Sequence, residues 1–145
     1  MKRNEYEMKN RAGNIRIGII GTGRITSRFV PEAKVVEGIT LSAVYNPRIS
    51  SAQIFSKANG IAYVCENLQE LFFYSDAVYI ASPPDSHVAY AKAALEAGKH
   101  VLCEKPIGFS KKDICMLMDL AKAKNLILME AIKTALQIRH RLYPM

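Results

Sequence analysis

Short apolar runs alternate with segments of helical periodicity along this chain, and the alternation constrains the fold more than any other feature. Strands are expected at 15–20, 40–45, 61–64, 76–81, 100–103 and 126–129. Helices are expected between them at 24–37, 50–59, 68–73, 86–97 and 111–124. A strand–helix–strand repeat requires parallel strands joined by right-handed crossovers. We therefore expect a single α/β domain with a doubly wound parallel sheet, the Rossmann fold.

Local signals indicate where several of these elements begin or end. Asn46-Pro47 predicts a turn after the second strand. Pro31 is expected to kink the first helix. Gly98 is expected to end the helix at 86–97, and Ser110 is the expected N-cap of the helix at 111–124.

The length and composition are those of one soluble globular domain. The chain has 145 residues, of which 50% are hydrophobic and 23% are charged. We interpret 1–14 as a polar N-terminal extension without the apolar core of a secretory signal, 15–134 as the domain and 135–145 as a tail. No apolar run reaches the roughly 18 residues of a membrane span, so a membrane partner is not expected.

The three cysteines favour a reducing compartment. Cys65, Cys103 and Cys115 are an odd number and form no Cys-x-x-Cys pair, which argues against a disulfide framework and a zinc site. We expect buried or idle thiols, no metal and a cytoplasmic location.

The charge balance is basic, with 20 Lys and Arg against 13 Asp and Glu and a formal net charge of +7. The basic residues are scattered, and no basic helix with interleaved aromatic residues is present. Nucleic acid is therefore disfavoured as a partner, whereas an excess of positive charge helps to recruit an anionic cofactor.

A glycine-rich turn follows the first expected strand. Gly21 and Gly23 form the Gly-x-Gly of a dinucleotide-binding fingerprint between a strand and a helix. Gly21 permits the tight turn, and Gly23 lets the backbone approach a pyrophosphate at the positive end of the helix. Thr26 stands at the third glycine position, which is a departure from the strict pattern.

The end of the second expected strand lacks the acidic residue that usually binds the adenosine ribose. Asn46 takes its place, and Arg48 follows two residues later. A neutral and a cationic residue favour NADP over NAD, because Arg48 can pair with a 2′-phosphate. The alternative is that Arg48 is only a solvated turn residue.

Two further motifs follow the fourth and fifth expected strands, at the sheet edge where open α/β folds bind ligands. Ser82-Pro83-Pro84-Asp85-Ser86-His87 has two prolines without backbone donors, which suits a wall beside a flat ring. His87 has an equally good structural interpretation. Glu104-Lys105-Pro106 places an ammonium beside a carboxylate, and Lys105 could handle the proton that accompanies hydride transfer.

These four stretches, in this order, resemble the glucose–fructose oxidoreductase and inositol dehydrogenase family (Gfo/Idh/MocA). The most specific parts are Ala-Gly-Lys-His-Val-Leu-Cys-Glu-Lys-Pro at 97–106 and Ser-Pro-Pro-Asp-Ser-His at 82–87.

The resemblance implies a nicotinamide dinucleotide cofactor and a role for each motif residue. It implies contacts of the pyrophosphate with Gly21, Gly23, Arg24 and Ile25, of the adenosine ribose with Asn46 and Arg48, of the cofactor cleft with Ser82, Pro83, Pro84 and His87, and of the nicotinamide with Glu104. It further implies that Lys105 is the catalytic lysine and that its bond to Pro106 is often cis in relatives. Met129-Glu130-Ala131 resembles the stretch beside the nicotinamide, with Lys133 close to it.

One departure from the family concerns the second domain, which binds substrate and supplies a partner acid or histidine to the lysine. The tail at 135–145 is too short to form that domain, and we interpret it as a docking helix or the remainder of a truncated protein. His140 is disfavoured as a substitute acid or base. The oligomeric state is left open, with a homo-oligomer among the options.

Two functional hypotheses remain. The leading one is an NAD(P)-dependent oxidoreductase that transfers a hydride to or from a sugar, polyol or related alcohol or carbonyl, with Lys105 as proton shuttle. The alternative is a stand-alone NAD(P)-binding sensor or regulatory module without catalysis.

Overall fold

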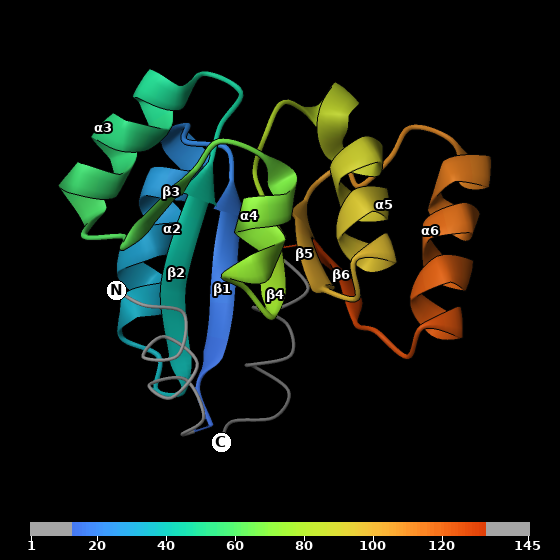
Figure 1. The fold of residues 1–145 in the computed structure, drawn as a ribbon. Helices are drawn as coiled ribbons and strands as arrows, with labels where there is room; N and C mark the ends of the chain where they lie inside the picture. Colours follow the sequence, from blue (N-terminus) through green and yellow to red (C-terminus); the bar gives the residue numbers. More distant parts are fainter. Residues whose placement is uncertain (1–12, 133–145) are drawn as a thin grey trace.

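A six-stranded sheet forms the centre of the molecule in the computed structural model, which describes residues 13–132 (Figure 1). The strands are β1 (Ile15–Ile20), β2 (Ile39–Tyr45), β3 (Tyr63–Cys65), β4 (Ala77–Ile80), β5 (His100–Glu104) and β6 (Leu128–Ala131). All five pairings are parallel, and the strand order is β3-β2-β1-β4-β5-β6. The expected doubly wound Rossmann sheet is confirmed.

Helices cover the two faces of this sheet. They are α2 (Arg24–Lys34), α3 (Ile49–Asn59), α4 (Leu68–Phe73), the 3₁₀ helix η1 (Pro84–Ser86), α5 (His87–Glu96) and α6 (Lys111–Ala123). Figure 1 shows α4, α5 and α6 in front of the sheet and α2 behind it. Two buried apolar clusters match this division, because α4, α5 and α6 contribute to one and α2 and α3 to the other. Neighbouring residues of β1 show the alternation, since Ile20 belongs to the first cluster and Ile19 to the second.

Several boundaries differ from the sequence expectation because turns take residues from neighbouring elements. The last strand begins at Leu128 rather than at 126. Asn125 adopts a left-handed φ of 55°, and the Leu126 N–H donates to Ala121 O (2.8 Å) in a Schellman cap that ends α6. The chain before α5 forms η1, so that α-helix begins at His87 rather than at 86.

The helix ends predicted from capping residues agree more closely with the structure. Ser110 Oγ accepts a hydrogen bond from the Asp113 N–H (3.1 Å), which confirms the expected N-cap of α6. Gly98 follows α5 with a φ of +76°, as expected of a residue that ends a helix. α2 continues past Pro31 but ends at Lys34, three residues before the expected end at 37.

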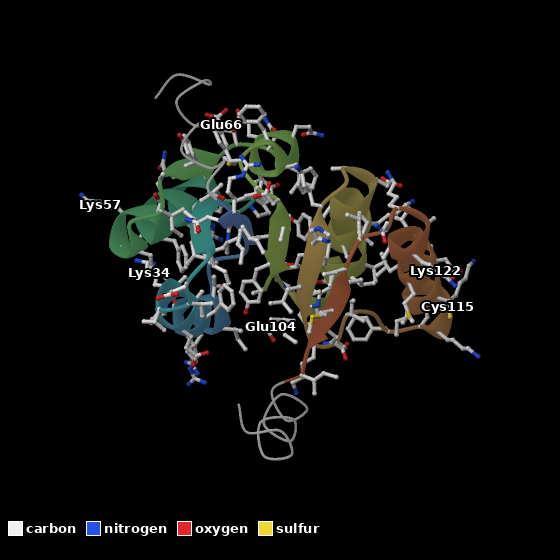
Figure 2. The ribbon with its side chains drawn as sticks, turned by 90° about the horizontal axis from the view of Figure 1, so that it is seen from below. Lys34, Lys57, Glu66, Glu104, Cys115 and Lys122 are labelled. Carbon is white, nitrogen blue, oxygen red and sulfur yellow. The ribbon has the colours of Figure 1, made fainter. Side chains whose placement is uncertain are left out.

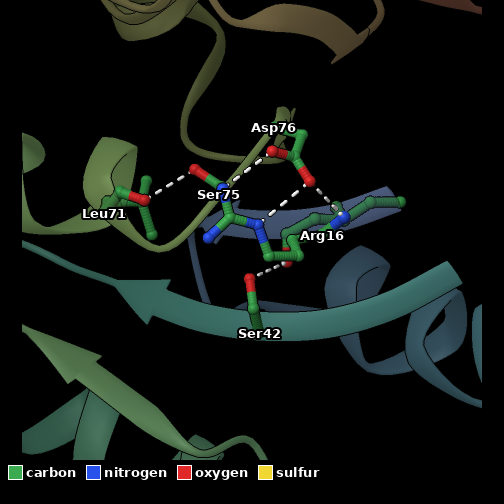
Figure 3. Close-up of polar contacts among 6 residues, drawn as sticks. Arg16, Ser42, Leu71, Ser75 and Asp76 are labelled. Atoms are coloured by element: carbon green, nitrogen blue, oxygen red, sulfur yellow. Dashed lines mark hydrogen bonds and ion pairs between the residues drawn. The ribbon is translucent and has the colours of Figure 1, made fainter. Parts of the chain in front are cut away.

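An ion pair joins β1 to the start of β4 at the amino edge of the sheet (Figure 3). The Arg16 guanidinium donates to both carboxylate oxygens of Asp76, at 3.0 Å from Nε and 2.7 Å from Nη2. The backbones also pair, since the Arg16 N–H donates to the Asp76 carboxylate (2.9 Å) and the Asp76 N–H donates to Arg16 O (2.8 Å). The hydrogen bond from the Arg16 side chain is the main cause that lowers the pKa of Asp76.

We predict that Asp76→Asn lowers the free energy of unfolding by about 1–2 kcal/mol at pH 7, because it removes a charge-assisted bidentate contact that is partly screened by solvent. The pKa of Asp76 is lower in the folded state, so this stabilisation is fully present above its unfolded value of about 4 and is lost as the pH falls through the folded value. Urea denaturation measures both effects. Asp119→Asn is the matched control on the exposed surface of α6, and an equal loss in both variants would contradict the prediction.

Candidate functional site

The four sequence motifs meet at the carboxyl edge of the sheet. They follow β1, β2, β4 and β5, which are neighbours in the sheet. The register aligns the ends of these strands, because Ile20 pairs with Tyr45 on one side and with Ile80 on the other. The fold therefore brings the glycine turn, the Asn46 turn, the proline loop and the Glu104 loop to one edge, as expected for this topology.

Gly21 lies where the backbones of two of these loops approach most closely. Its φ is +99°, and a Cβ at this position would lie 2.5 Å from Ala81 O. The Gly21 N–H donates to Tyr45 O (3.0 Å), and the Ala81 N–H donates to Ile20 O (2.9 Å). Only glycine satisfies both the backbone conformation and the close approach.

Gly23 differs from Gly21, because its lack of a side chain leaves open space in front of α2. Its φ of −84° suits any residue, and a Cβ there would meet no described atom within 4 Å. Gly23 is the N-cap of α2, and neither a capping side chain nor an acidic residue occupies the first turn of that helix. The first N–H groups of a helix lack intrahelical partners and carry partial positive charge. The exposed side chains of Arg24 and Ile25 flank this terminus, and helix termini of this kind are suited to anions.

Thr26 fills the place of the third glycine in the fingerprint. Its side chain is fully buried, and Oγ1 donates to Gly21 O (3.1 Å). The hydroxyl thus ties the first turn of α2 to the glycine turn, which explains why this departure from the strict pattern is compatible with the fold.

The Asn46 turn is held in place by its own amide group. Nδ2 donates to Thr22 Oγ1 (3.0 Å) in the glycine turn, and Oδ1 accepts from the Arg48 N–H (2.8 Å). Arg48 is exposed at the N-cap of α3, and among residues 13–132 its guanidinium makes no ion pair. A cationic group is therefore left available beside an ordered polar turn.

The proline loop packs on a buried histidine. His87 is 1% exposed, and its ring nitrogens lie 2.8 Å from Ser82 O and 2.8 Å from Pro106 O. Ser86 Oγ donates to Ser82 Oγ (2.7 Å), while Pro83 and Pro84 are exposed at the edge. The buried imidazole thus joins the loop after β4 to the loop after β5.

The Glu104 loop is fixed on both sides of its lysine. The Lys105–Pro106 peptide bond is cis, as the family resemblance implied. Tyr79 Oη donates to Glu104 Oε1 (2.6 Å), and the Ile107 N–H donates to Glu130 Oε2 (2.7 Å). Lys105 is exposed, and its ammonium has no hydrogen-bond or ion-pair partner in the described part of the chain.

Metal and thiol chemistry receive no support from the described residues. Between residues 13 and 132, no group of three or more His, Cys, Asp or Glu side chains is arranged to hold a metal ion. Burial raises the pKa of the Cys103 thiol, next to Glu104, to about 12, so this thiol stays protonated at neutral pH. The helices of the same region include none long and apolar enough to cross a membrane.

Sequence reasoning missed the side chains that hold the loops together. Thr22 and Tyr79 were not singled out, and Glu130 was assigned only to the stretch beside the nicotinamide. Tyr79 is the single hydroxyl-bearing residue of β4, in a run that is otherwise apolar, and this was the signal that could have revealed it. Lys133 and His140 lie outside the described residues.

The fold and these loops define a nicotinamide-dinucleotide-binding domain of an oxidoreductase. A family model described as "Oxidoreductase family, NAD-binding Rossmann fold" matches residues 15–132. The chain therefore belongs to the Gfo/Idh/MocA family, and the resemblance of the motifs is confirmed.

Named relatives support the same assignment. The scyllo-inositol 2-dehydrogenase (NADP(+)) IolU of Bacillus subtilis is 42% identical over 122 residues, which are 83% of this chain and 37% of that protein. The structure of apo scyllo-inositol dehydrogenase from Lactobacillus casei is 30% identical over 81% of this chain and 36% of its own, with a TM-score of 0.73. The structure of the Y186F mutant of KijD10, a 3-ketoreductase from Actinomadura kijaniata in complex with TDP-benzene and NADP, is 30% identical. The match covers 89% of this chain and 42% of its own, with a TM-score of 0.77. The chain thus spans about two fifths of these relatives or less.

The two fingerprint glycines give a matched pair of variants. We predict that Gly21→Ala destabilises the fold by about 2 kcal/mol or more, because it adds backbone strain and a clash with Ala81. Gly23→Ala should cost less than about 1 kcal/mol, yet weaken dinucleotide binding at least about tenfold, because its methyl group takes the space in front of the helix terminus. Thermal unfolding and calorimetry separate the two. Equal stability losses, or unimpaired binding by Gly23→Ala, would refute the assignment.

Proposed function

We propose that this chain is the cofactor-binding part of an NADP-dependent oxidoreductase that acts on a sugar, a polyol or a related alcohol or carbonyl compound. The observation that carries the proposal is the uncapped N-terminus of α2, with open space at Gly23 and a cationic side chain at Arg24. Backbone N–H groups and positive charge at one point suit a pyrophosphate.

The residues around this terminus fit the rest of a dinucleotide. In this proposal Gly21, Gly23, Arg24 and Ile25 hold the pyrophosphate, Asn46 and Arg48 hold the adenosine ribose and its 2′-phosphate, and Ser82, Pro83, Pro84, His87 and Glu104 form the cleft towards the nicotinamide. His87 supports this cleft without lining it directly, since its ring is buried and contacts backbone carbonyls of the two loops. The nicotinamide, when bound, supplies the hydride chemistry.

Lys105 is the residue that we propose to move the proton. Its exposed ammonium stands at the carboxyl edge on a loop that Glu130 and His87 fix through the backbone. An ammonium on such a loop can protonate a substrate oxygen as hydride arrives, and the resulting amine can accept a proton in the reverse direction.

Two relatives guide the proposed substrate class and cofactor preference. IolU is named as an NADP⁺-linked scyllo-inositol 2-dehydrogenase, and the KijD10 structure contains NADP. A cyclic polyol or sugar is accordingly the proposed substrate class. The free thiols of Cys65, Cys103 and Cys115 support the further proposal that the protein works in the cytoplasm.

A stand-alone sensor of the NADP pool is the second candidate. A sensor would need the dinucleotide contacts but would have no use for a lysine presented by an ordered loop at the nicotinamide end. The fixed Glu104–Lys105–Pro106 loop therefore favours the enzyme.

We predict that NADPH binds this chain more tightly than NADH. Arg48→Ala should weaken NADPH binding about tenfold and affect NADH binding much less, because the charge-assisted contact of Arg48 is with the 2′-phosphate, which NADH lacks. Arg24→Ala is the matched control and should weaken both cofactors alike, since the pyrophosphate is common to them. Calorimetry that finds equal affinities in the wild type, or NADH the stronger ligand, would disprove the preference for NADP.

We also predict that residues 1–145 alone turn over polyols poorly even when NADP⁺ is bound. The substrate-binding domain of the family lies outside these residues, so no substrate is held against Lys105. The measurement is NADPH formation from scyllo-inositol at saturating NADP⁺, compared with the same assay on a longer family member. Efficient turnover by the isolated chain would show that the domain binds substrate unaided.

A further inference from the structure

A buried tyrosine of β4 reaches the Glu104 loop through the interior of the domain. Tyr79 is 1% exposed, and its ring stacks on Phe29 of α2 with the ring centres 3.8 Å apart. Its hydroxyl donates to Glu104 Oε1 at 2.6 Å, a short distance of the kind found when the acceptor is a carboxylate. Figure 2 shows Glu104 at the end of the sheet, on the side of α2.

The register of the sheet explains why these two side chains meet. Tyr79 pairs with Leu102 of β5, and Glu104 follows two residues later on the same face. Glu104 therefore lies two residues closer to the carboxyl edge than the position opposite Tyr79. A strand pair with this offset lets a residue inside the core hold a group at the rim.

Packing alone does not account for the hydroxyl. The aromatic ring belongs to an apolar cluster with Ile19, Val30 and Val44, and phenylalanine would fill the same space without a polar atom. Burial, and secondly the hydrogen bond to Glu104, raise the pKa of Tyr79 above its ordinary value, so the phenol is a proton donor at neutral pH. A buried hydroxyl is costly unless it has a partner, and the partner here belongs to the candidate site.

The other two fixed points of the loop are held through the backbone. His87 contacts Pro106 O, and Glu130 accepts from the Ile107 N–H. In the described part of the chain, the hydrogen bond from Tyr79 is the one hydrogen bond of the Glu104 side chain. The direction of this carboxylate therefore depends on a residue that is itself buried in the core.

We propose that Tyr79 is a positioning residue for the nicotinamide end of the cofactor. Its hydroxyl aims the Glu104 carboxylate, and it thereby also fixes the start of the turn that presents Lys105. The inference rests on the proposed function, because it needs a dinucleotide whose nicotinamide lies beside Glu104.

The test compares two ligands that differ at one end only. NADPH has a nicotinamide, whereas 2′-phospho-ADP-ribose has the same adenosine phosphate and pyrophosphate without it. We expect Tyr79→Phe to weaken NADPH binding about tenfold, as for loss of a hydrogen bond to a charged group, and to leave the affinity for 2′-phospho-ADP-ribose unchanged. The fluorescence of bound NADPH should shift towards that of free NADPH, because it reports the surroundings of the nicotinamide.

Two further variants define the outcomes. Tyr90→Phe is the matched control, since Tyr90 also loses a hydroxyl that contacts a side chain, but on the opposite face of the sheet. Glu104→Ala should reproduce the selective loss of NADPH binding, and adding Tyr79→Phe to it should have no further effect. Glu104→Ala also tests the carboxylate directly if Tyr79→Phe does not fold.

Three results would overturn the role of Tyr79. They are an unchanged affinity for NADPH in Tyr79→Phe, an equal loss of affinity for both ligands, and effects of the two substitutions that multiply in the double variant. Wild-type protein that binds neither ligand would instead refute the cofactor site, so failure of the proposed function is recognisable separately.

Discussion

The close approach of Gly21 to the backbone of Ala81 is the contact on which the site depends. It forces the loop after β1 against the loop after β4, at a distance that any Cβ would prevent. The same residue is joined to the end of β2 through the hydrogen bond to Tyr45 O. The carboxyl ends of β1, β2 and β4 are thereby held side by side, and α2 begins beside them at Gly23. This contact thus fixes the glycine turn relative to both the Asn46 turn and the proline loop.

The second half of the edge is organised by side chains instead of by a backbone contact. His87 from α5 and Glu130 from β6 hold the backbone of the Glu104 loop, and Tyr79 from β4 holds its carboxylate. Each of these side chains comes from a regular element whose position is set by the core. Preorganisation of this loop supports the role that we propose for Lys105, because a proton donor must meet the substrate oxygen in a defined geometry.

The order of elements and the position of the site followed from the sequence, because both depend on local patterns. Apolar runs predict the strands, and in a parallel sheet the residues after them meet at one edge. The predicted start of β6 at residue 126 was wrong. The Schellman cap at Asn125 and Leu126 is closed by backbone hydrogen bonds, which an apolar pattern does not reveal. The contact of Tyr79 with Glu104 was missed for a related reason. It joins residues 25 apart in sequence, and only the register of β4 and β5 brings them together.

Charge is used differently at the two edges of the sheet. At the amino edge, Arg16 is paired with Asp76, and the pair joins β1 to the start of β4. At the carboxyl edge, the N-terminus of α2 lacks a capping side chain, and Arg48 and Lys105 make no ion pair among residues 13–132. Uncompensated positive groups raise the energy of a domain that has no ligand. At the carboxyl edge, where backbone contacts already hold the loops, the phosphates of the proposed dinucleotide would compensate these groups. The ion pair at the amino edge thus joins two strands, whereas the positive groups at the carboxyl edge are left for the dinucleotide that we propose.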